Sequence, residues 1–271
     1  MQKTFDYKDA TISYELTGNG LPVVVLLHGF GEDSGIWAEQ INFLQNHCTL
    51  IIPDLPGTGS SSFKDAQNAS SIECYAAIIA DLLKHENITS CVLLGHSMGG
   101  YITLAYAEKY TSTLKGFGLI HSTAFADSRE KKQTRQKGIA IMEEYGGYAF
   151  LKNTTPNLFS ARYKMQYPEK VEELIEKGKA FSVKSLQDYY KAMMSRPDRI
   201  QVLKESDVPV LFIIGTDDVA APIQDVLQQT HLPKISFINI LKETGHIGMW
   251  ESSDKVNEAI LEFINHTSIN G

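Results

Sequence analysis

Short apolar runs alternate with segments of helical periodicity along much of the chain. Four of these runs lie in the first half: VVVLLH (23–28), CTLIIPDL (48–55), SCVLLGH (90–96) and KGFGLIH (115–121). Because each run is continuous instead of alternating with polar residues, it is typical of a strand buried on both faces. Strands of this kind separated by helices predict a parallel sheet with helices on both sides. The first 20 residues instead predict a β-hairpin, with ATISYELTG leading into the turn residues GNG.

The alternation stops after the fourth run and returns near the C-terminus. PVLFIIG (209–215) and ISFINI (235–240) are two further predicted strands, and a helix is expected after each. The stretch between them and the first half has helical periodicity and no clear strand. We therefore expect an α/β core formed by residues 1–122 and 206–271, with residues 123–205 inserted as helices.

The distribution of charge supports the same boundaries. Residues 123–205 hold 16 Lys and Arg against 11 Asp and Glu, whereas the rest of the chain holds 9 against 21. A change of sign this large is typical of a boundary between structural units. All arginines of the chain fall in the basic stretch: Arg129, Arg135, Arg162, Arg196 and Arg199.

Composition limits the classes of function. The net charge of −7 argues against a nucleic-acid partner, and no apolar run is long enough to cross a membrane. The segment MQKTFDYKDA has no apolar centre, so we expect no signal peptide, and three cysteines without metal-ligand spacing favour reduced thiols. The expectation is a cytoplasmic protein with a small-molecule substrate as its partner; the sequence makes no prediction of an oligomeric state.

One serine stands where a predicted strand meets a predicted helix. Residues 95–99, Gly-His-Ser-Met-Gly, follow the G-x-S-x-G pattern of a nucleophile elbow, in which a strained turn projects the serine above the sheet. Side chains at Gly95 and Gly99 would crowd that turn. The N-terminus of the following helix would also favour negative charge developing near Ser97.

A serine hydroxyl becomes a strong nucleophile only when a base takes its proton and a third group orients the base. Asp217 and Asp218 follow the strand 209–215, and His246 follows the last predicted strand. The chain order serine, aspartate, histidine is the one used by sheets of this architecture. We therefore expect Ser97 to be the nucleophile and His246 the base, with one of the two aspartates as the orienting acid.

The chain resembles the α/β-hydrolase fold family. The resemblance rests on five stretches in order: LLHGFGEDSGIW, PDLPGTGSS, GHSMGGYITLAYAEKY, GTDDVAAP and GHIGMWE. It implies the acid three residues after the glycine that closes its strand, so Gly215 selects Asp218 over Asp217. It also implies an oxyanion hole formed by the backbone amides of Phe30 and Met98, and a helical cap, the insertion 123–205, above the nucleophile.

Two further histidines have open roles. His121 ends a predicted strand on the side where strand ends carry function, so it is a candidate for the substrate pocket or for a hydrogen-bonded structural role. His96, next to the nucleophile, is a candidate for lining the pocket or for packing beside the turn. We expect no cofactor, and no metal, because no H-x-H, H-E-x-x-H or C-x-x-C pattern occurs.

The leading functional prediction is a serine hydrolase that cleaves small-molecule esters or related acyl compounds through an acyl-enzyme on Ser97. One alternative uses the same triad as a C–C bond hydrolase or lyase for a carboxylate-bearing substrate, which a basic lid rich in arginine could recruit. Against that idea, the basic residues could simply form a solvated surface. Another alternative is a ligand-binding receptor with a vestigial triad.

Overall fold

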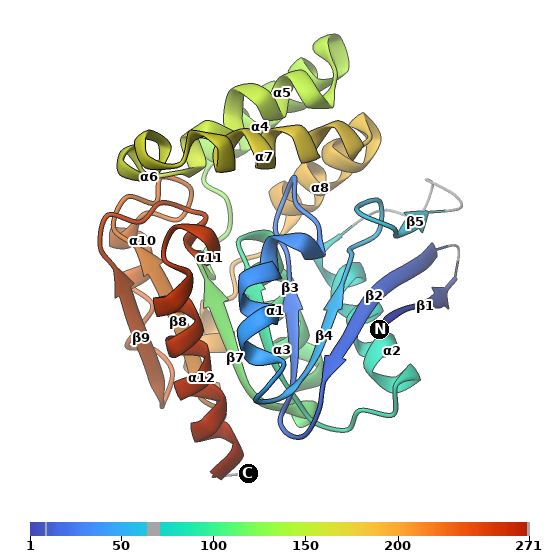
Figure 1. Cartoon of the computed structure of the whole chain (residues 1–271), viewed down its shortest axis with the longest axis vertical. Helices are drawn as coiled ribbons and strands as arrows, with labels where there is room; N and C mark the ends of the chain where they lie inside the picture. Colours follow the sequence, from blue (N-terminus) through green and yellow to red (C-terminus); the bar gives the residue numbers. More distant parts are fainter. Residues whose placement is uncertain (9, 64–70, 270–271) are drawn as a thin grey trace.

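The computed structural model describes residues 1–8, 10–63 and 71–269, and in these ranges a nine-stranded sheet forms the centre of the molecule (Figure 1). Eight strands follow the order β1-β2-β4-β3-β6-β7-β8-β9, and β5 pairs with β2 at the side of this path. The strands are β1 (Gln2–Tyr7), β2 (Ala10–Gly18), β3 (Val23–Leu27), β4 (Thr49–Pro53), β5 (Ser62–Phe63), β6 (Cys91–His96), β7 (Leu114–Ile120), β8 (Val210–Gly215) and β9 (Ser236–Leu241).

The sheet is mostly parallel, as predicted. β1 and β2 form the expected antiparallel hairpin, and β2 is also antiparallel to β4 and β5. All pairs from β4 through β9 along the sheet are parallel. β5 was not predicted, because its two residues are too few to give a hydrophobic pattern.

The continuous apolar runs place side chains on both faces of the sheet. Along β3, Val23 and Val25 belong to one hydrophobic core, whereas Val24 and Leu26 belong to another. Helices α2 (Ile72–His85) and α3 (Met98–Tyr110) contribute to the first core, and α1 (Ala38–Leu44) and α12 (Ser253–Ile269) to the second. This two-faced burial is the physical reason why the runs contain so few polar residues.

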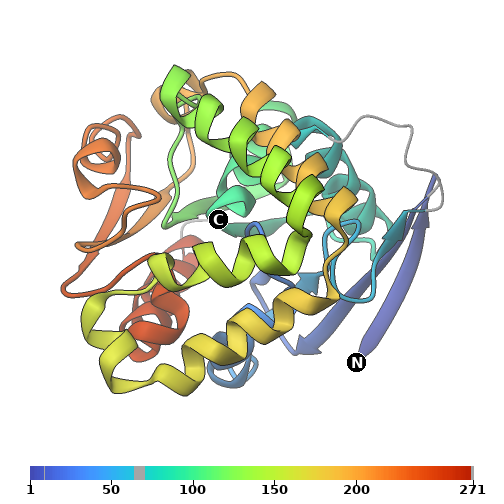
Figure 2. The same cartoon turned by 90° about the horizontal axis from the view of Figure 1, so that it is seen from above.

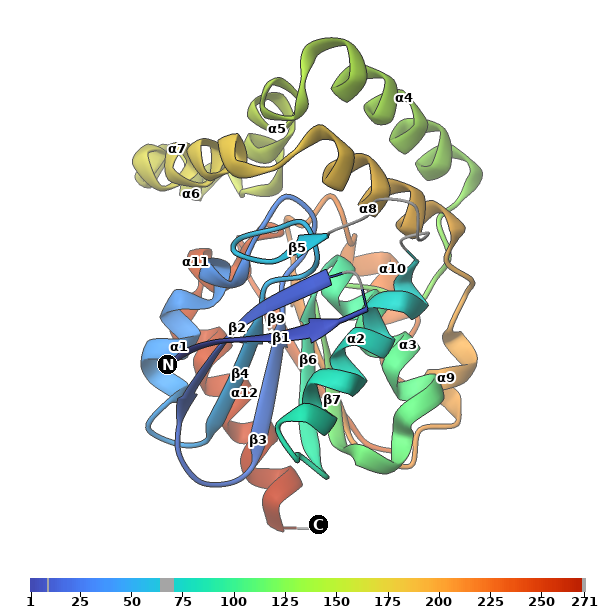
Figure 3. The same ribbon diagram turned by 90° about the vertical axis from the view of Figure 1, so that its right-hand side faces the viewer.

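Between β7 and β8 the chain forms a layer of helices that lies at one end of the sheet (Figures 1 and 2). We call residues 129–195 the helical layer. Its helices are α4 (Arg129–Tyr145), α5 (Gly147–Thr154), α6 (Ala161–Gln166), α7 (Pro168–Lys177) and α8 (Val183–Ser195). Helix α9 (Ile200–Lys204) also falls inside the predicted insertion, but it packs against α3 and lies away from the layer (Figure 3).

The remaining helices are short. They are α10 (Ile223–Leu227) and α11 (Gly248–Glu251), with single turns of 3₁₀ helix at Ser34–Trp37, Thr111–Thr113, Thr155–Leu158 and Gly178–Ala180. None of the helices in the described ranges combines the length and the apolar composition that crossing a bilayer requires.

Candidate active site

Ser97 occupies the sharp turn between β6 and α3. Its backbone has φ +51° and ψ −115°, a conformation that residues other than glycine adopt rarely and at a cost in strain. Two hydrogen bonds hold this turn against the next strand and its extension: the Ser97 amide donates to the Ile120 carbonyl, and the Ser122 hydroxyl donates to the Ser97 carbonyl at 2.7 Å. The serine is therefore fixed at the end of a buried strand and at the start of a helix.

The flanking glycines are required by close backbone contacts. A Cβ atom on Gly95 would lie 2.2 Å from the carbonyl carbon and oxygen of Gly99. A Cβ atom on Gly99 would lie 2.4 Å from the carbonyl oxygen of Leu27 in β3. These are backbone atoms, which cannot rotate away as side chains can. The crowding expected from the sequence therefore comes from the backbone of Gly99 and Leu27.

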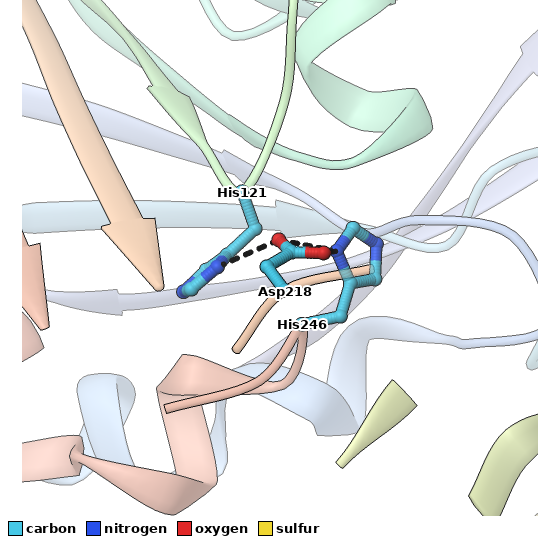
Figure 4. Close-up of side chains that lie close together, drawn as sticks. All are labelled: His121, Asp218 and His246. Atoms are coloured by element: carbon cyan, nitrogen blue, oxygen red, sulfur yellow. Dashed lines mark hydrogen bonds and ion pairs between the residues drawn. The ribbon is translucent and has the colours of Figure 1, made fainter. Parts of the chain in front are cut away.

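Asp218 and His246 meet beyond the ends of β8 and β9 (Figure 4). His246 Nδ1 lies 2.8 Å from Asp218 Oδ2 and 3.0 Å from Oδ1. The amides of Ala220 and Ala221 also donate to Oδ1, at 2.8 and 2.9 Å. Asp217, in contrast, is exposed and accepts from the Thr216 hydroxyl, so it is Asp218 that contacts the histidine.

The charges of this pair support each other. Burial alone would raise the pKa of Asp218, but the charge of His246 and hydrogen bonds from His121 and His246 hold it well below the ordinary value. Burial alone would lower the pKa of His246, but the Asp218 carboxylate raises it above the ordinary value. The arrangement stabilises an imidazolium at His246, which is what a general base needs after it has taken a proton.

A second buried pair connects His246 to the residue that precedes Ser97. His96 Nδ1 lies 2.9 Å from Glu32 Oε2, and His96 Nε2 lies 2.9 Å from the His246 carbonyl oxygen. Glu32 also accepts from the Gly29 amide at 2.8 Å. Burial opposes ionisation of Glu32, yet the charge and hydrogen bond of His96 lower its pKa. The loop after β3, the end of β6 and the His246 loop are thus tied together.

The Ser97 hydroxyl lies beside this cluster but is not bonded to the base. Among the hydrogen bonds of the described residues, none joins Ser97 Oγ to His246, and none uses the amides of Phe30 or Met98. A Cβ atom on Gly29 would lie 3.1 Å from Ser97 Cβ, so the loop that carries Phe30 passes close to the serine. The amides of Phe30 and Met98 therefore have no hydrogen-bond partner among the described residues.

The helical layer packs on Phe30. The Phe30 ring stacks on Tyr190 of α8, with centroids 4.3 Å apart, and meets the edge of Phe150 of α5 at 6.4 Å. Gly31, with φ +70°, brings the same loop against Leu151. The helical layer thus contacts the loop that follows β3, at the end of the sheet that it faces (Figure 1).

A family model described as "alpha/beta hydrolase fold" matches residues 22–253 of this chain, which is most of its length. The chain belongs to the α/β-hydrolase fold family. The solved structure of a thermophilic esterase from Thermogutta terrifontis is 26% identical and has a TM-score of 0.91, covering 98% of this chain and 99% of that one.

Two curated relatives cover most of both sequences. The karrikin insensitive 2 receptor CA of Petunia hybrida is 26% identical over 93% of this chain and 95% of the relative. A 2-hydroxy-6-oxononadienedioate/2-hydroxy-6-oxononatrienedioate hydrolase of Burkholderia vietnamiensis is 25% identical over 96% of this chain and 92% of the relative. This chain is thus similar to a protein described as an esterase, to one named as a hydrolase of a dienedioate or trienedioate and to one named as a receptor.

Within this α/β hydrolase, the two histidines with open roles are both buried. The side chains of His96 and His121 are 0% exposed. His96 uses both ring nitrogens in the contacts described above, and His121 Nδ1 lies 3.1 Å from Asp218 Oδ2 (Figure 4). Both histidines are therefore buried and hydrogen-bonded, and a role for either of them in lining a substrate pocket stays a prediction.

His121, Asp218 and His246 are also close enough to be considered as metal ligands, with ligand atoms within 4.8 Å of one another. In the observed arrangement, however, both Nδ1 atoms face the Asp218 carboxylate, and hydrogen bonds account for these contacts. A nitrogen that donates its proton to a carboxylate has no lone pair left for a metal ion.

Sequence reasoning missed two residues at this site, Glu32 and Ser122. Glu32 contacts His96 across 64 positions of sequence, and Ser122 contacts Ser97 across 25. Neither separation along the sequence corresponds to a known motif. The one available signal was position: both residues lie in segments that follow strands ending at the same edge of the sheet.

Most of the arginines are held by acidic side chains of the chain itself. Arg135 and Arg196 both bind Asp127, Arg199 binds Glu73 and Glu108, and Arg162 binds Glu243. Arg199 is 2% exposed and Arg196 is 3% exposed. These residues connect the helical layer and its flanking segments to the core, so a purely solvated basic surface does not describe them.

Proposed function

We propose that this chain is a serine hydrolase that acts on small-molecule esters or related acyl compounds through an acyl-enzyme on Ser97. The observation that carries the proposal is the buried Asp218–His246 hydrogen bond at 2.8 Å, next to a serine in a strained strand-to-helix turn. His246 takes the proton of Ser97 as the hydroxyl attacks the acyl carbon, and Asp218 holds the imidazolium that forms. The imidazolium then gives this proton to the departing alcohol, and the acyl group stays on Ser97. His246 next takes a proton from water as the water attacks the acyl carbon, and it returns the proton to Ser97 as the acid leaves.

The negative charge on the acyl oxygen needs donors that are in place before the reaction. We assign this role to the amides of Phe30 and Met98. In support, Met98 is the first residue of α3, so its amide lies at the positive end of the helix dipole. Phe30 is held by stacking on Tyr190 and by an edge contact with Phe150, which limits movement of its loop. Preorganised donors of this kind are each worth about 10²- to 10³-fold in rate.

In this proposal, residues 1–122 and 206–271 are the catalytic core and residues 123–205 are the cap. The packing of Phe30 on α5 and α8 supports it, because the helical layer then both supports the oxyanion loop and restricts access of water to Ser97.

A second candidate is hydrolysis of a C–C bond in a carboxylate-bearing substrate by the same triad. The observation that favours it is Arg135, whose guanidinium lies 5.0 Å above the ring of Tyr190, the residue that stacks on Phe30. The dienedioate hydrolase of Burkholderia vietnamiensis is named for a substrate with two carboxylates. Comparing a neutral ester with its carboxylate-bearing analogue across a salt series tests whether arginine recruits the carboxylate, because this attraction weakens with salt. Equal rates at low and high salt would contradict recruitment.

The proposal is tested with nitrophenyl esters graded by chain length and charge. We expect repeated turnover by the wild type and a loss on the order of 10⁶-fold in kcat for Ser97→Ala. Ser195→Ala, at an exposed serine, is the matched control and should retain wild-type activity. A receptor with a vestigial triad would release product only up to about one equivalent. If Ser97→Ala stays as active as the wild type, the mechanism is wrong.

A further inference from the structure

His121 lies on the other side of Asp218 from His246 (Figure 4), and the mechanism above does not use it. Its backbone, directly after β7, has φ +50°, which is unusual for a residue other than glycine. Its side chain is 0% exposed, and Nδ1 lies 3.1 Å from Asp218 Oδ2 (Figure 4). The imidazole of His121 thus contacts Asp218 from a strained backbone position and is completely buried.

The hydrogen bond has a definite direction. Asp218 is ionised, so the proton must lie on His121 Nδ1, which donates to the carboxylate. Burial lowers the pKa of His121, and the neighbouring His246 and His96 oppose a second positive charge. A neutral ring that carries its proton on Nδ1 leaves Nε2 as an acceptor, and Nε2 is buried with no hydrogen-bond partner among the described residues.

The opposite side of the ring is closed by Gly248, at the start of α11. A Cβ atom on Gly248 would lie 2.1 Å from His121 Nε2, and the three nearest atoms that it would meet all belong to this imidazole. Gly215 also approaches, since a Cβ atom there would lie 3.1 Å from His121 Cε1. The ring is therefore confined between two glycine backbones and the acid.

Asp218 thus receives donors on every side. Its Oδ1 accepts from the amides of Ala220 and Ala221, and its Oδ2 accepts from His121, while His246 Nδ1 lies within hydrogen-bond distance of both oxygens. Without His121, nothing among the described residues besides His246 itself would hold Oδ2. A neutral donor fixes this oxygen without adding a positive charge that would compete with the imidazolium of His246.

We propose that His121 is a positioning residue, a neutral Nδ1–H donor that fixes the Asp218 carboxylate in the orientation that His246 requires. This role rests on the proposed function of Ser97, Asp218 and His246, and it adds to that triad a fourth residue that touches no substrate.

Activity measurements on His121→Ala and His121→Asn test the role. We expect His121→Ala to lower kcat by about 10- to 100-fold with little change in KM, because one hydrogen bond to a charged group is lost and no substrate contact changes. His121→Asn should recover most of the loss, because an amide can donate from nearly the same position and asparagine tolerates positive φ. Thermal unfolding of each variant identifies any loss that comes from instability.

A double-mutant cycle with Gly248 makes the test specific. Gly248→Ala should lower kcat in the wild type, because its methyl group would displace the imidazole from Asp218. In the His121→Ala background the same change should cost little, because the ring it would strike is gone. Equal losses in both backgrounds would overturn the proposal, as would wild-type kcat in His121→Ala.

A readout that needs no substrate separates this proposal from the proposed function. The titration of His246 can be followed by NMR in the wild type and in His121→Ala. Loss of a donor makes the carboxylate more basic, so the midpoint of His246 should rise in the variant. An unchanged midpoint contradicts the role of His121. A wild type that cleaves no ester, with the midpoint shifted as expected, contradicts the proposed function alone.

Discussion

At the scale of single residues, the environment of Asp218 decides the chemistry of His246. Asp217 and Asp218 are neighbours of the same type, yet one is exposed and the other has a side chain that is 0% exposed. Only the buried carboxylate can raise the pKa of His246 strongly, because burial keeps water from screening the pair. The functional difference between the two aspartates is thus one of position and not of residue type.

This environment predicts a pH dependence. The base must be neutral to accept a proton, and Asp218 raises the pKa of His246, so kcat/KM should be low in acid and rise with pH. Its midpoint should lie above about 6.5, the ordinary value for histidine. Asp218→Asn should lower kcat by about 10⁴-fold by stabilising the wrong tautomer of His246.

Asp217→Asn is the matched control for that variant. Because this exposed side chain accepts only from Thr216 among the described residues, we expect the kcat and the pH midpoint of Asp217→Asn to match the wild type. A loss of activity in Asp217→Asn equal to that in Asp218→Asn would reject the assignment of the acid.

At the scale of elements, the turn between β6 and α3 depends on how closely three backbone segments approach. Gly95 and Gly99 face each other across the turn, and Gly99 also contacts the last residue of β3, Leu27. The strand, the helix and the neighbouring strand can therefore meet only without side chains at these positions. The position of Ser97 above the sheet is a consequence of this packing.

Gly95→Ala should therefore destabilise the fold as well as the site. We expect a decrease of about 1–3 kcal/mol in the free energy of unfolding, since the new methyl group would overlap backbone atoms of Gly99. Urea denaturation measures it. Gly35→Ala is the control, because among the described residues its methyl group would meet side chains of Asp33 and Lys177 and no backbone atom, and it should cost less than Gly95→Ala. Equal effects of the two substitutions would contradict this explanation.

At the scale of the whole molecule, the two segments that join the helical layer to the core are fastened to each other. Asp127, before α4, binds Arg196, after α8, at 2.8 Å, and it also binds Arg135 of the layer at 2.7 Å. Arg196 lies 3.7 Å from the ring centre of Tyr101 in α3, and the Arg199 amide donates to the Ala124 carbonyl. The position of the layer over the site therefore depends on a buried cluster of charges.

Asp127→Asn should destabilise this cluster, because the buried guanidinium of Arg196 and the half-buried one of Arg135 would remain beside a neutral side chain. We expect a loss of about 3–5 kcal/mol in the free energy of unfolding, measured by urea denaturation. Asp207→Asn, which breaks an exposed ion pair with Lys234, should have little effect. If both variants unfold at the same urea concentration as the wild type, the cluster does not fasten the layer.

The sequence alone determined the parts of this protein that depend on local pattern. Continuous apolar runs predicted the parallel strands, because a strand buried on two faces has no polar positions to alternate with. Gly95 and Gly99 predicted a tight turn at Ser97, because a turn of this kind has no room for side chains at these two positions and the five-residue pattern 95–99 shows both glycines. The order of strands also placed Asp218 and His246 at one edge of the sheet.

Only the tertiary structure decided which side chains meet at that edge. The contacts of Glu32 with His96 and of His121 with Asp218 span 64 and 97 positions, and both are directional bonds between single atoms. Hydrophobic periodicity carries no information about such pairs. It indicates which face of a helix or strand is buried, but not which side chains contact that face. The same holds for Asp127 and Arg196, whose charges in the sequence were equally compatible with a solvated surface.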